Sequence, residues 1–140
     1  MIVYAETSAV LRWILGEAGG DEVRTVLAAA ERVVSSTLTP LECARGISRA
    51  VTMGRIGRGE ELAALRLLDT AAAKWAVLEM SGRVLTRARG AFPLEPVRTL
   101  DAIHLATALV FRDVMPELAL ASLDARIRAN AEALAIPVAP

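Results

Sequence analysis

Short apolar segments alternate with longer helical segments along this sequence, and that alternation limits the possible folds more than any other feature. The sequence predicts strands at Ile2–Ala5, Val33–Ser36, Trp75–Leu78 and Leu118–Ser122, with a final edge strand at Ile136–Val138. Strands separated by helices need crossover connections, which favour parallel pairing. We therefore expect a three-layer α/β/α sandwich with a mainly parallel central sheet.

Capping residues and glycines mark the helices between these strands. The predicted helices are Thr7–Leu15, Asp21–Arg32, Thr39–Met53, Glu60–Ala73, Arg83–Arg89, Thr99–Phe111 and Asp124–Leu134. Asp21 and Thr99 are predicted N-caps, and Thr39 is predicted to form a capping box with Glu42, with Pro40 at the first helical position. Gly54–Gly59 and Phe92–Arg98 are expected to be loops. With no repeat or linker in the sequence, we expect one domain over residues 1–140.

Composition excludes several classes of protein. The chain has 140 residues, of which 54% are apolar and 23% charged, so it can bury a core as a globular domain. It has no run of roughly 18 apolar residues that could cross a bilayer and no basic leader segment. Cys43 is the only cysteine, which rules out an internal disulfide and suits a reducing compartment. We expect a cytoplasmic protein that does not contact membranes.

Charge argues against bulk electrostatic binding of nucleic acid, because the formal net charge is zero. The positive residues are nevertheless almost all arginine, with Lys74 the only lysine. Arginine offers a planar fork for phosphate and stacks on bases. A genome rich in GC codons explains the same bias equally well.

Acidic residues follow the predicted strands at the edge where open parallel sheets carry their chemistry. Glu6 ends the first strand, Glu42 and Asp101 are expected in first helical turns, and Asp124 opens the last helix. Each alone has a structural explanation, since acids in a first turn complement the helix dipole. Asp101, however, lies in a helix that is apolar nearly all round, and Glu6 directly follows an apolar strand. Buried carboxylates of this kind need partners.

Together these acids predict a metal site. Carboxylates that meet in one cleft repel one another unless a cation neutralises them. Oxygen ligands without His or Cys select Mg²⁺ or Mn²⁺, which suits phosphoryl transfer by an activated water.

The same segments resemble the motifs of PIN domains. Met1–Val10 resembles the first strand and motif, and Thr39–Glu42 the second. Leu100–Ala108 resembles the third motif and is the most specific match, while Ser122–Arg126 with the tail to Pro137 resembles the fourth. The resemblance covers the whole chain in the right order. Within PIN domains it is greatest to the compact VapC toxins of prokaryotic toxin–antitoxin pairs.

This resemblance implies a Mg²⁺-dependent endoribonuclease, with Mn²⁺ able to substitute, that cleaves structured RNA. The protein would form a homodimer and be held inactive by a small VapB-like antitoxin. Its metal-binding and catalytic residues would be Glu6, Asp101, Asp124 and Glu42, with Glu6 and Asp101 the principal ligands and Glu42 completing the cluster or holding a metal-bound water. Ser8 and Ser122 would orient the carboxylates or water.

One position departs from the family, which usually has Asp where this chain has Glu6. Glutamate keeps the charge but is one methylene longer, and Mg²⁺ demands tight octahedral geometry. The departure bears on the level of activity more than on the class of function. It also sustains an alternative hypothesis, a catalytically weak or inactive PIN-like binding module that acts only with a partner protein.

Other residues have two interpretations each. Arg12, Arg45 and Arg98 are candidate RNA contacts, as are Arg49, Arg55 and Arg58, although solvated helix faces with local ion pairs explain them as well. His104, one turn after Asp101, is either a packed histidine or a general base, and the metal makes packing the better explanation. Cys43 is expected to be buried filler, and Trp13 either core or a partner anchor.

Two other acidic-site enzymes lack their required residues here. A phospho-accepting receiver domain needs an acidic pair at the first strand and a late lysine. A haloacid-dehalogenase-type phosphatase needs Asp-x-Asp where this chain has Glu6-Thr7-Ser8.

Overall fold

A four-stranded parallel sheet forms the centre of the protein in the computed structural model, which describes all 140 residues. Its strands are β1 (Ile2–Ala5), β2 (Arg32–Ser36), β3 (Ala76–Leu78) and β4 (Ala119–Ala121). They lie in the order β3-β2-β1-β4, and every pair is parallel. The chain therefore passes through a helical crossover between strands, as the alternating pattern predicted.

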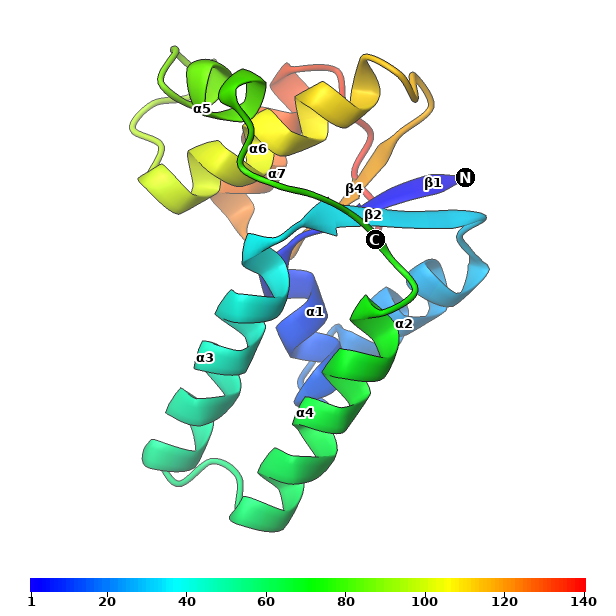
Figure 1. Cartoon of the computed structure of the whole chain (residues 1–140), viewed down its shortest axis with the longest axis vertical. Helices are drawn as coiled ribbons and strands as arrows, with labels where there is room; N and C mark the ends of the chain where they lie inside the picture. The colour runs from blue at the N-terminus through cyan, green and yellow to red at the C-terminus, as the bar shows by residue number, and fades with distance from the viewer.

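Helices cover both faces of the sheet (Figure 1). One layer contains α1 (Thr7–Ile14), α2 (Gly20–Ala29), α3 (Leu38–Thr52) and α4 (Arg58–Ala72), and the other contains α5 (Gly82–Ala88), α6 (Thr99–Arg112) and α7 (Ala125–Ala133). In Figure 1, α3 and α4 run side by side as a long hairpin that extends below the sheet. The predicted three-layer α/β/α architecture is confirmed.

Strand β1 joins two hydrophobic cores because its side chains alternate between the faces. Val3 and Ala5 pack with the helices of the first layer, including Val10 and Ile47, whereas Tyr4 packs in the second core with Leu105. All six side chains are fully buried. The carboxyl end of β1 is thus held between both helical layers, and Glu6 follows directly at that point.

Two predicted N-caps are wrong. Helix α2 begins at Gly20 with Gly19 as its cap, not Asp21. Gly19 has a left-handed φ of 87°, and a Cβ on Gly20 would lie 2.4 Å from the Arg12 carbonyl oxygen, so close packing against α1 dictates this start. Helix α6 begins at Thr99 with Arg98 as its cap.

The predicted capping box of Thr39 with Glu42 does not form. Helix α3 begins at Leu38, so Glu42 lies in its second turn and not in its first. The Thr39 hydroxyl is buried and accepts a hydrogen bond of 2.8 Å from Ser35 Oγ on strand β2. Because Thr39 bonds Ser35 and forms no capping box, the structural explanation for Glu42 is lost, and the Glu42 carboxylate is left for other contacts.

Two smaller boundaries also differ. Helix α4 begins at Arg58, inside the predicted loop, and Glu60 accepts a hydrogen bond from the Gly57 amide at its start. The predicted edge strand Ile136–Val138 is reduced to a single parallel bridge between Val138 and Leu120.

Candidate active site

The four acids surround one end of the sheet. Glu6 caps α1 after β1, Asp101 lies in the first turn of α6, and Asp124 caps α7 after β4. Glu42 reaches the same region from the second turn of α3. Because parallel strands end at a common edge, the helices that follow them begin together, and acids at their first turns become neighbours.

Glu6 is almost completely buried, and hydroxyl groups hold one of its oxygens. Its Oε2 accepts hydrogen bonds from Ser8 Oγ at 2.5 Å, from Ser122 Oγ at 2.8 Å and from the Ser8 amide at 3.0 Å. Burial raises the pKa of Glu6, while the charge of His104 and the bonds from both serines oppose that rise. Ser8 and Ser122, the residues expected to orient a carboxylate, therefore both contact Glu6.

Asp101 has a buried oxygen without a hydrogen-bond donor. Its Oδ2 has no hydrogen-bond partner, and Arg98 Nε, 3.5 Å away, forms an ion pair with it but not a hydrogen bond. Burial raises the pKa of Asp101, and the negative charge of Asp124 raises it further. The opposing charge of Arg98 is the weaker influence because that side chain is 78% exposed. A buried carboxylate oxygen that has no hydrogen bond, lies beside a second carboxylate and is paired only with an exposed arginine is a site that attracts a cation.

Asp124 has the structural role that is typical of its position. Its Oδ1 accepts hydrogen bonds of 2.9 Å from the amides of Arg126 and Ile127, which caps α7. Its own amide lies 3.1 Å from both Ser8 Oγ and Ser122 Oγ, which ties the cap to the serines around Glu6. Capping uses one oxygen and leaves the other free.

Glu42 is held by a histidine from the opposite helical layer. His104 Nε2 lies 2.5 Å from Glu42 Oε1, and Thr7 Oγ1 donates to the same oxygen at 2.9 Å. Because a carboxylate oxygen only accepts, Nε2 carries the proton and donates. Burial alone raises the pKa of Glu42, but the hydrogen bond and charge of His104 outweigh it, so the pKa is lowered overall.

Tyr4 completes this set of contacts. Its hydroxyl lies 2.8 Å from His104 Nδ1 and donates there when the ring is neutral, with its single proton on Nε2. Both side chains are at most 1% exposed. His104 is thus the buried, packed histidine that the sequence favoured, but it also contacts an acid of the site directly.

A hollow of about 380 Å³ opens beside these acids. It is lined by Glu42, Arg98, Thr99, Leu100 and Asp101. A larger hollow of about 740 Å³ lies elsewhere, between α5 and α6, and contains no acid of the four. We associate function with the smaller one because it combines the partly exposed Glu42 carboxylate with the Asp101 oxygen that lacks a hydrogen bond.

The side chains do not form a closed metal cage. No group of three or more His, Cys, Asp or Glu residues lies close enough together to hold a metal ion. Mg²⁺, however, is commonly bound through one or two carboxylates, with water and substrate phosphate supplying the other oxygens. The unpartnered Asp101 Oδ2, the nearby charge of Asp124 and an all-oxygen donor set fit such a site.

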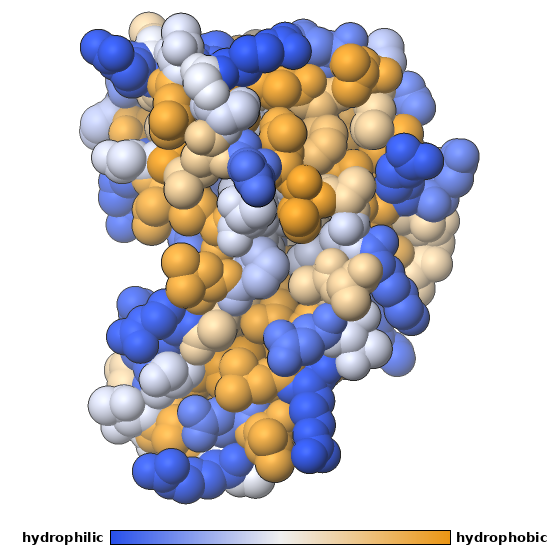
Figure 2. All heavy atoms as spheres, viewed as in Figure 1, coloured by the Kyte–Doolittle hydropathy of each residue, from blue (hydrophilic) through white to orange (hydrophobic).

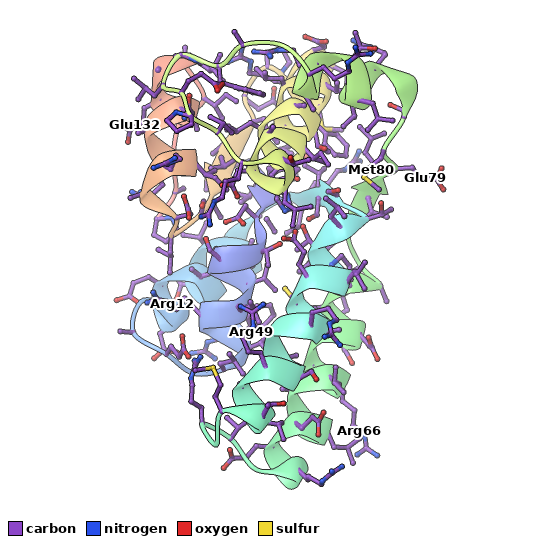
Figure 3. All side chains as sticks on the ribbon, turned by 90° about the vertical axis from the view of Figure 1, so that its left-hand side faces the viewer. Arg12, Arg49, Arg66, Glu79, Met80 and Glu132 are labelled. Atoms are coloured by element: carbon purple, nitrogen blue, oxygen red, sulfur yellow. The ribbon has the colours of Figure 1, made fainter.

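The candidate RNA-binding arginines differ in whether an acid of the chain already pairs with them. Arg12 pairs with Glu17 at 3.4 Å and donates to the Ala18 carbonyl, and Arg98 pairs with Asp101. Arg55 also pairs with Glu17, so its loop position does not leave it unpaired. Arg45 is exposed and has no ion pair. In Figure 3, Arg12 and Arg49 lie on the side of the molecule turned towards the reader, on α1 and α3.

Cys43 and Trp13 belong largely to the core. Cys43 is fully buried, and burial together with the charges of Glu6 and Glu42 raises the pKa of its thiol, as expected for a small filler side chain. Trp13 is partly buried against the core of the first layer and also lines two surface hollows.

Sequence reasoning missed Tyr4 and Thr7 as parts of the site. Thr7 was available as a hydroxyl residue directly after Glu6. Tyr4 gave no such signal, because a tyrosine in an apolar strand is ordinarily read as core.

Comparison with known proteins identifies the family. The PIN domain family model matches residues 3–133, so the chain belongs to the PIN domain family. Within it, the chain is 33% identical to ribonuclease VapC35 of Mycobacterium tuberculosis over 143 aligned positions, covering 98% of this chain and 95% of that protein. The predicted membership, including the likeness to VapC ribonucleases, is confirmed.

Solved structures support the fold. The Mycobacterium tuberculosis toxin VapC20, described as cleaving the sarcin–ricin loop, matches with a TM-score of 0.63 and 17% identity over 91% of this chain and 93% of that one. VapBC2 from Rickettsia felis, solved with a DNA fragment from its promoter, matches with a TM-score of 0.61 and 12% identity over 99% and 97%. At these identities the likeness concerns the fold alone.

Proposed function

We propose that this protein is a Mg²⁺-dependent endoribonuclease that acts as the toxin of a toxin–antitoxin pair. The observation that carries the proposal is the unpartnered buried oxygen of Asp101 among the other acids at the carboxyl edge of the sheet. The proposal is supported by the likeness to ribonuclease VapC35 along nearly the whole chain. A bound Mg²⁺ or Mn²⁺ would lower the pKa of a water and polarise the scissile phosphate.

The residues of the chain have separate parts in this proposal. Asp101 and Asp124 would hold the cation, and Glu6, fixed by Ser8, would add negative charge beside it. Glu42 lines the hollow and would complete the acidic cluster at the mouth. Exposed arginines such as Arg45 would bind RNA phosphate outside that acidic centre.

Partners are proposed on the same basis. The name VapBC2 denotes a VapC-type toxin together with a VapB partner. By analogy, we propose a VapB-like antitoxin as the partner of this chain. We also propose a homodimer, because large apolar side chains such as Leu62, Val77 and Val114 are exposed on several elements. Figure 2 shows apolar residues gathered at the surface of both the upper part and the α3–α4 hairpin. No helix combines the length and hydropathy that a bilayer span requires, and a cytoplasmic location is proposed.

A second candidate function is a binding module without turnover. Two observations favour it. No three possible ligands converge on one point, and Oε2 of Glu6 already accepts hydrogen bonds from Ser8 and Ser122. This alternative predicts binding of RNA or a partner with no cleavage.

One experiment separates the two. The purified chain, free of any partner, is incubated with structured cellular RNA in Mg²⁺, in Mn²⁺ and in EDTA, beside Asp101→Asn and the exposed control Asp69→Asn. Cleavage that needs metal and disappears only in Asp101→Asn supports the nuclease. RNA binding without cleavage under all conditions supports the binding module.

A further inference from the structure

His104 makes an unusual contact across the molecule. It lies on α6, in one helical layer, whereas Glu42 lies on α3, in the layer on the opposite face of the sheet (Figure 1). The 2.5 Å contact between Nε2 and Oε1 joins the two layers at the edge where the acids gather. The buried Nε2–H group needs an acceptor, and the acceptor that the fold supplies is an acid of the candidate site.

The contacts of Glu42 are divided between its two oxygens. Oε1 receives both His104 Nε2 and Thr7 Oγ1, whereas no hydrogen bond within the chain reaches Oε2. The Glu42 side chain is 23% exposed and lines the hollow beside Asp101. One oxygen is therefore anchored in the protein, and the other is available to the hollow.

His104 is itself held in one orientation. Nε2 faces Glu42 and donates to it, so in the neutral ring Nδ1 has no proton and accepts from Tyr4 Oη. Tyr4 is fully buried on β1, at the rigid centre of the sheet. A chain of hydrogen bonds thus connects Tyr4 on the sheet to His104 and His104 to Glu42. Thr7 on α1 is a second donor to Glu42.

We propose that His104 is a positioning residue, which fixes Oε1 of Glu42 through Nε2–H so that Oε2 is directed to the metal and substrate hollow. This inference rests on the proposed ribonuclease function. Partners that orient a carboxylate ligand commonly contribute about 10- to 100-fold to metal affinity or activity. Glu42 has three rotatable side-chain bonds and is partly exposed, so it loses a defined position when its anchor is removed.

Three variants test the role of His104. His104→Leu removes the ring nitrogens, and we expect kcat and Mn²⁺ affinity to fall about 10- to 100-fold with KM for RNA little changed. His104→Gln carries an amide N–H at the same distance along the side chain as Nε2, and we expect it to restore both to within about threefold of wild type. Leu105→Ala, in the core on the same helix, controls for lost stability.

The outcomes are distinct. A His104→Leu protein that cleaves RNA and binds Mn²⁺ like wild type overturns the role of His104, as does an equal loss in Leu105→Ala. A wild-type chain that neither cleaves RNA nor binds Mn²⁺ overturns the proposed function instead.

A second measurement needs no activity. His104 is the only histidine of the chain, so the imidazole signals in ¹⁵N spectra belong to this residue alone. We expect the Nε2–H tautomer with a ring proton that exchanges slowly, and we expect Glu42→Ala to shift that signal and speed its exchange. An Nδ1–H tautomer, or ring signals unchanged in Glu42→Ala, would contradict the proposed contact.

Discussion

Replacement of Asp101 by asparagine should stabilise the metal-free protein while it abolishes metal-dependent cleavage. The side chain of Asp101 is 16% exposed, and its Oδ2 is buried without a hydrogen-bond partner. An unsatisfied buried polar group costs about 1–3 kcal/mol, and more when charged. Asparagine keeps a polar atom at this position, so it removes only the part of that cost that is due to the charge, about 1–2 kcal/mol. The ion pair with the exposed Arg98 side chain, which asparagine would lose, contributes at most about 1 kcal/mol.

The difference between these values gives the expected effect. In EDTA at neutral pH, Asp101→Asn should raise the free energy of unfolding by about 1 kcal/mol, or the midpoint of thermal unfolding by about 3–4 °C. The pKa of Asp101 is raised above its ordinary value of 3.8, so the ionised carboxyl destabilises the folded state at neutral pH. That penalty disappears as the pH falls through the folded pKa towards 3.8, and the two proteins should then converge.

The assay is urea denaturation of both proteins in EDTA over a series of pH values. Asp69→Asn, at an exposed position on α4, is the matched control and should change stability by less than about 0.5 kcal/mol. Asp101→Asn no more stable than wild type at neutral pH would refute the reasoning. Saturating Mg²⁺ should reduce the difference in the free energy of unfolding between the two proteins. Only wild type keeps the carboxylate ligand, so only its folded state is stabilised by metal binding.

Three further predictions concern single residues. Glu6→Asp should keep or raise cleavage whereas Glu6→Gln abolishes it, and full activity in the Gln variant, measured in Mg²⁺, would show that the charge of Glu6 is not needed beside the metal. Arg45→Ala should weaken RNA binding and lower the magnitude of the slope of log affinity against log salt by about 0.7–0.9. Arg55 is already paired with Glu17, so Arg55→Ala should leave this slope unchanged. An unaltered slope in Arg45→Ala would exclude a contact between Arg45 and RNA phosphate. Cys43, buried with its pKa raised, should resist thiol reagents in the native protein and react once denaturant unfolds it, so rapid modification of the native chain would contradict the burial.

Several parts of the fold were readable from local pattern. The strand at Ile2–Ala5 and the helix ending near Arg112 have composition and periodicity that agree with the structure. Failures occurred where tertiary contacts compete with local signals. Thr39 has the sequence of a capping residue, yet it bonds Ser35 on a neighbouring strand, a partner 4 residues away that no helix-start rule includes. Asp21 is not the N-cap of α2 because the helix already begins at Gly20, which packs against the backbone of α1.

The acids show the same division. Glu6, Asp101 and Asp124 could be named from the sequence because each follows a predicted strand or opens a predicted helix, and parallel topology brings such positions to one edge. The capping box that explained Glu42 was wrong, and its real partners, Thr7 and His104, are 35 and 62 residues away along the chain. Such separations are beyond any local pattern.

The sequence by itself determined the alternation of strands and helices, the family motifs and the acidic character of the site, since these depend on residue type and short-range spacing. Only the tertiary structure decided how those acids are partnered. It left Asp101 Oδ2 without a donor, bonded Glu6 to Ser8 and Ser122, and joined Glu42 to His104 across the sheet. The physical reason is that desolvation and hydrogen bonding depend on which atoms surround a group in space, and those atoms come from distant parts of the chain.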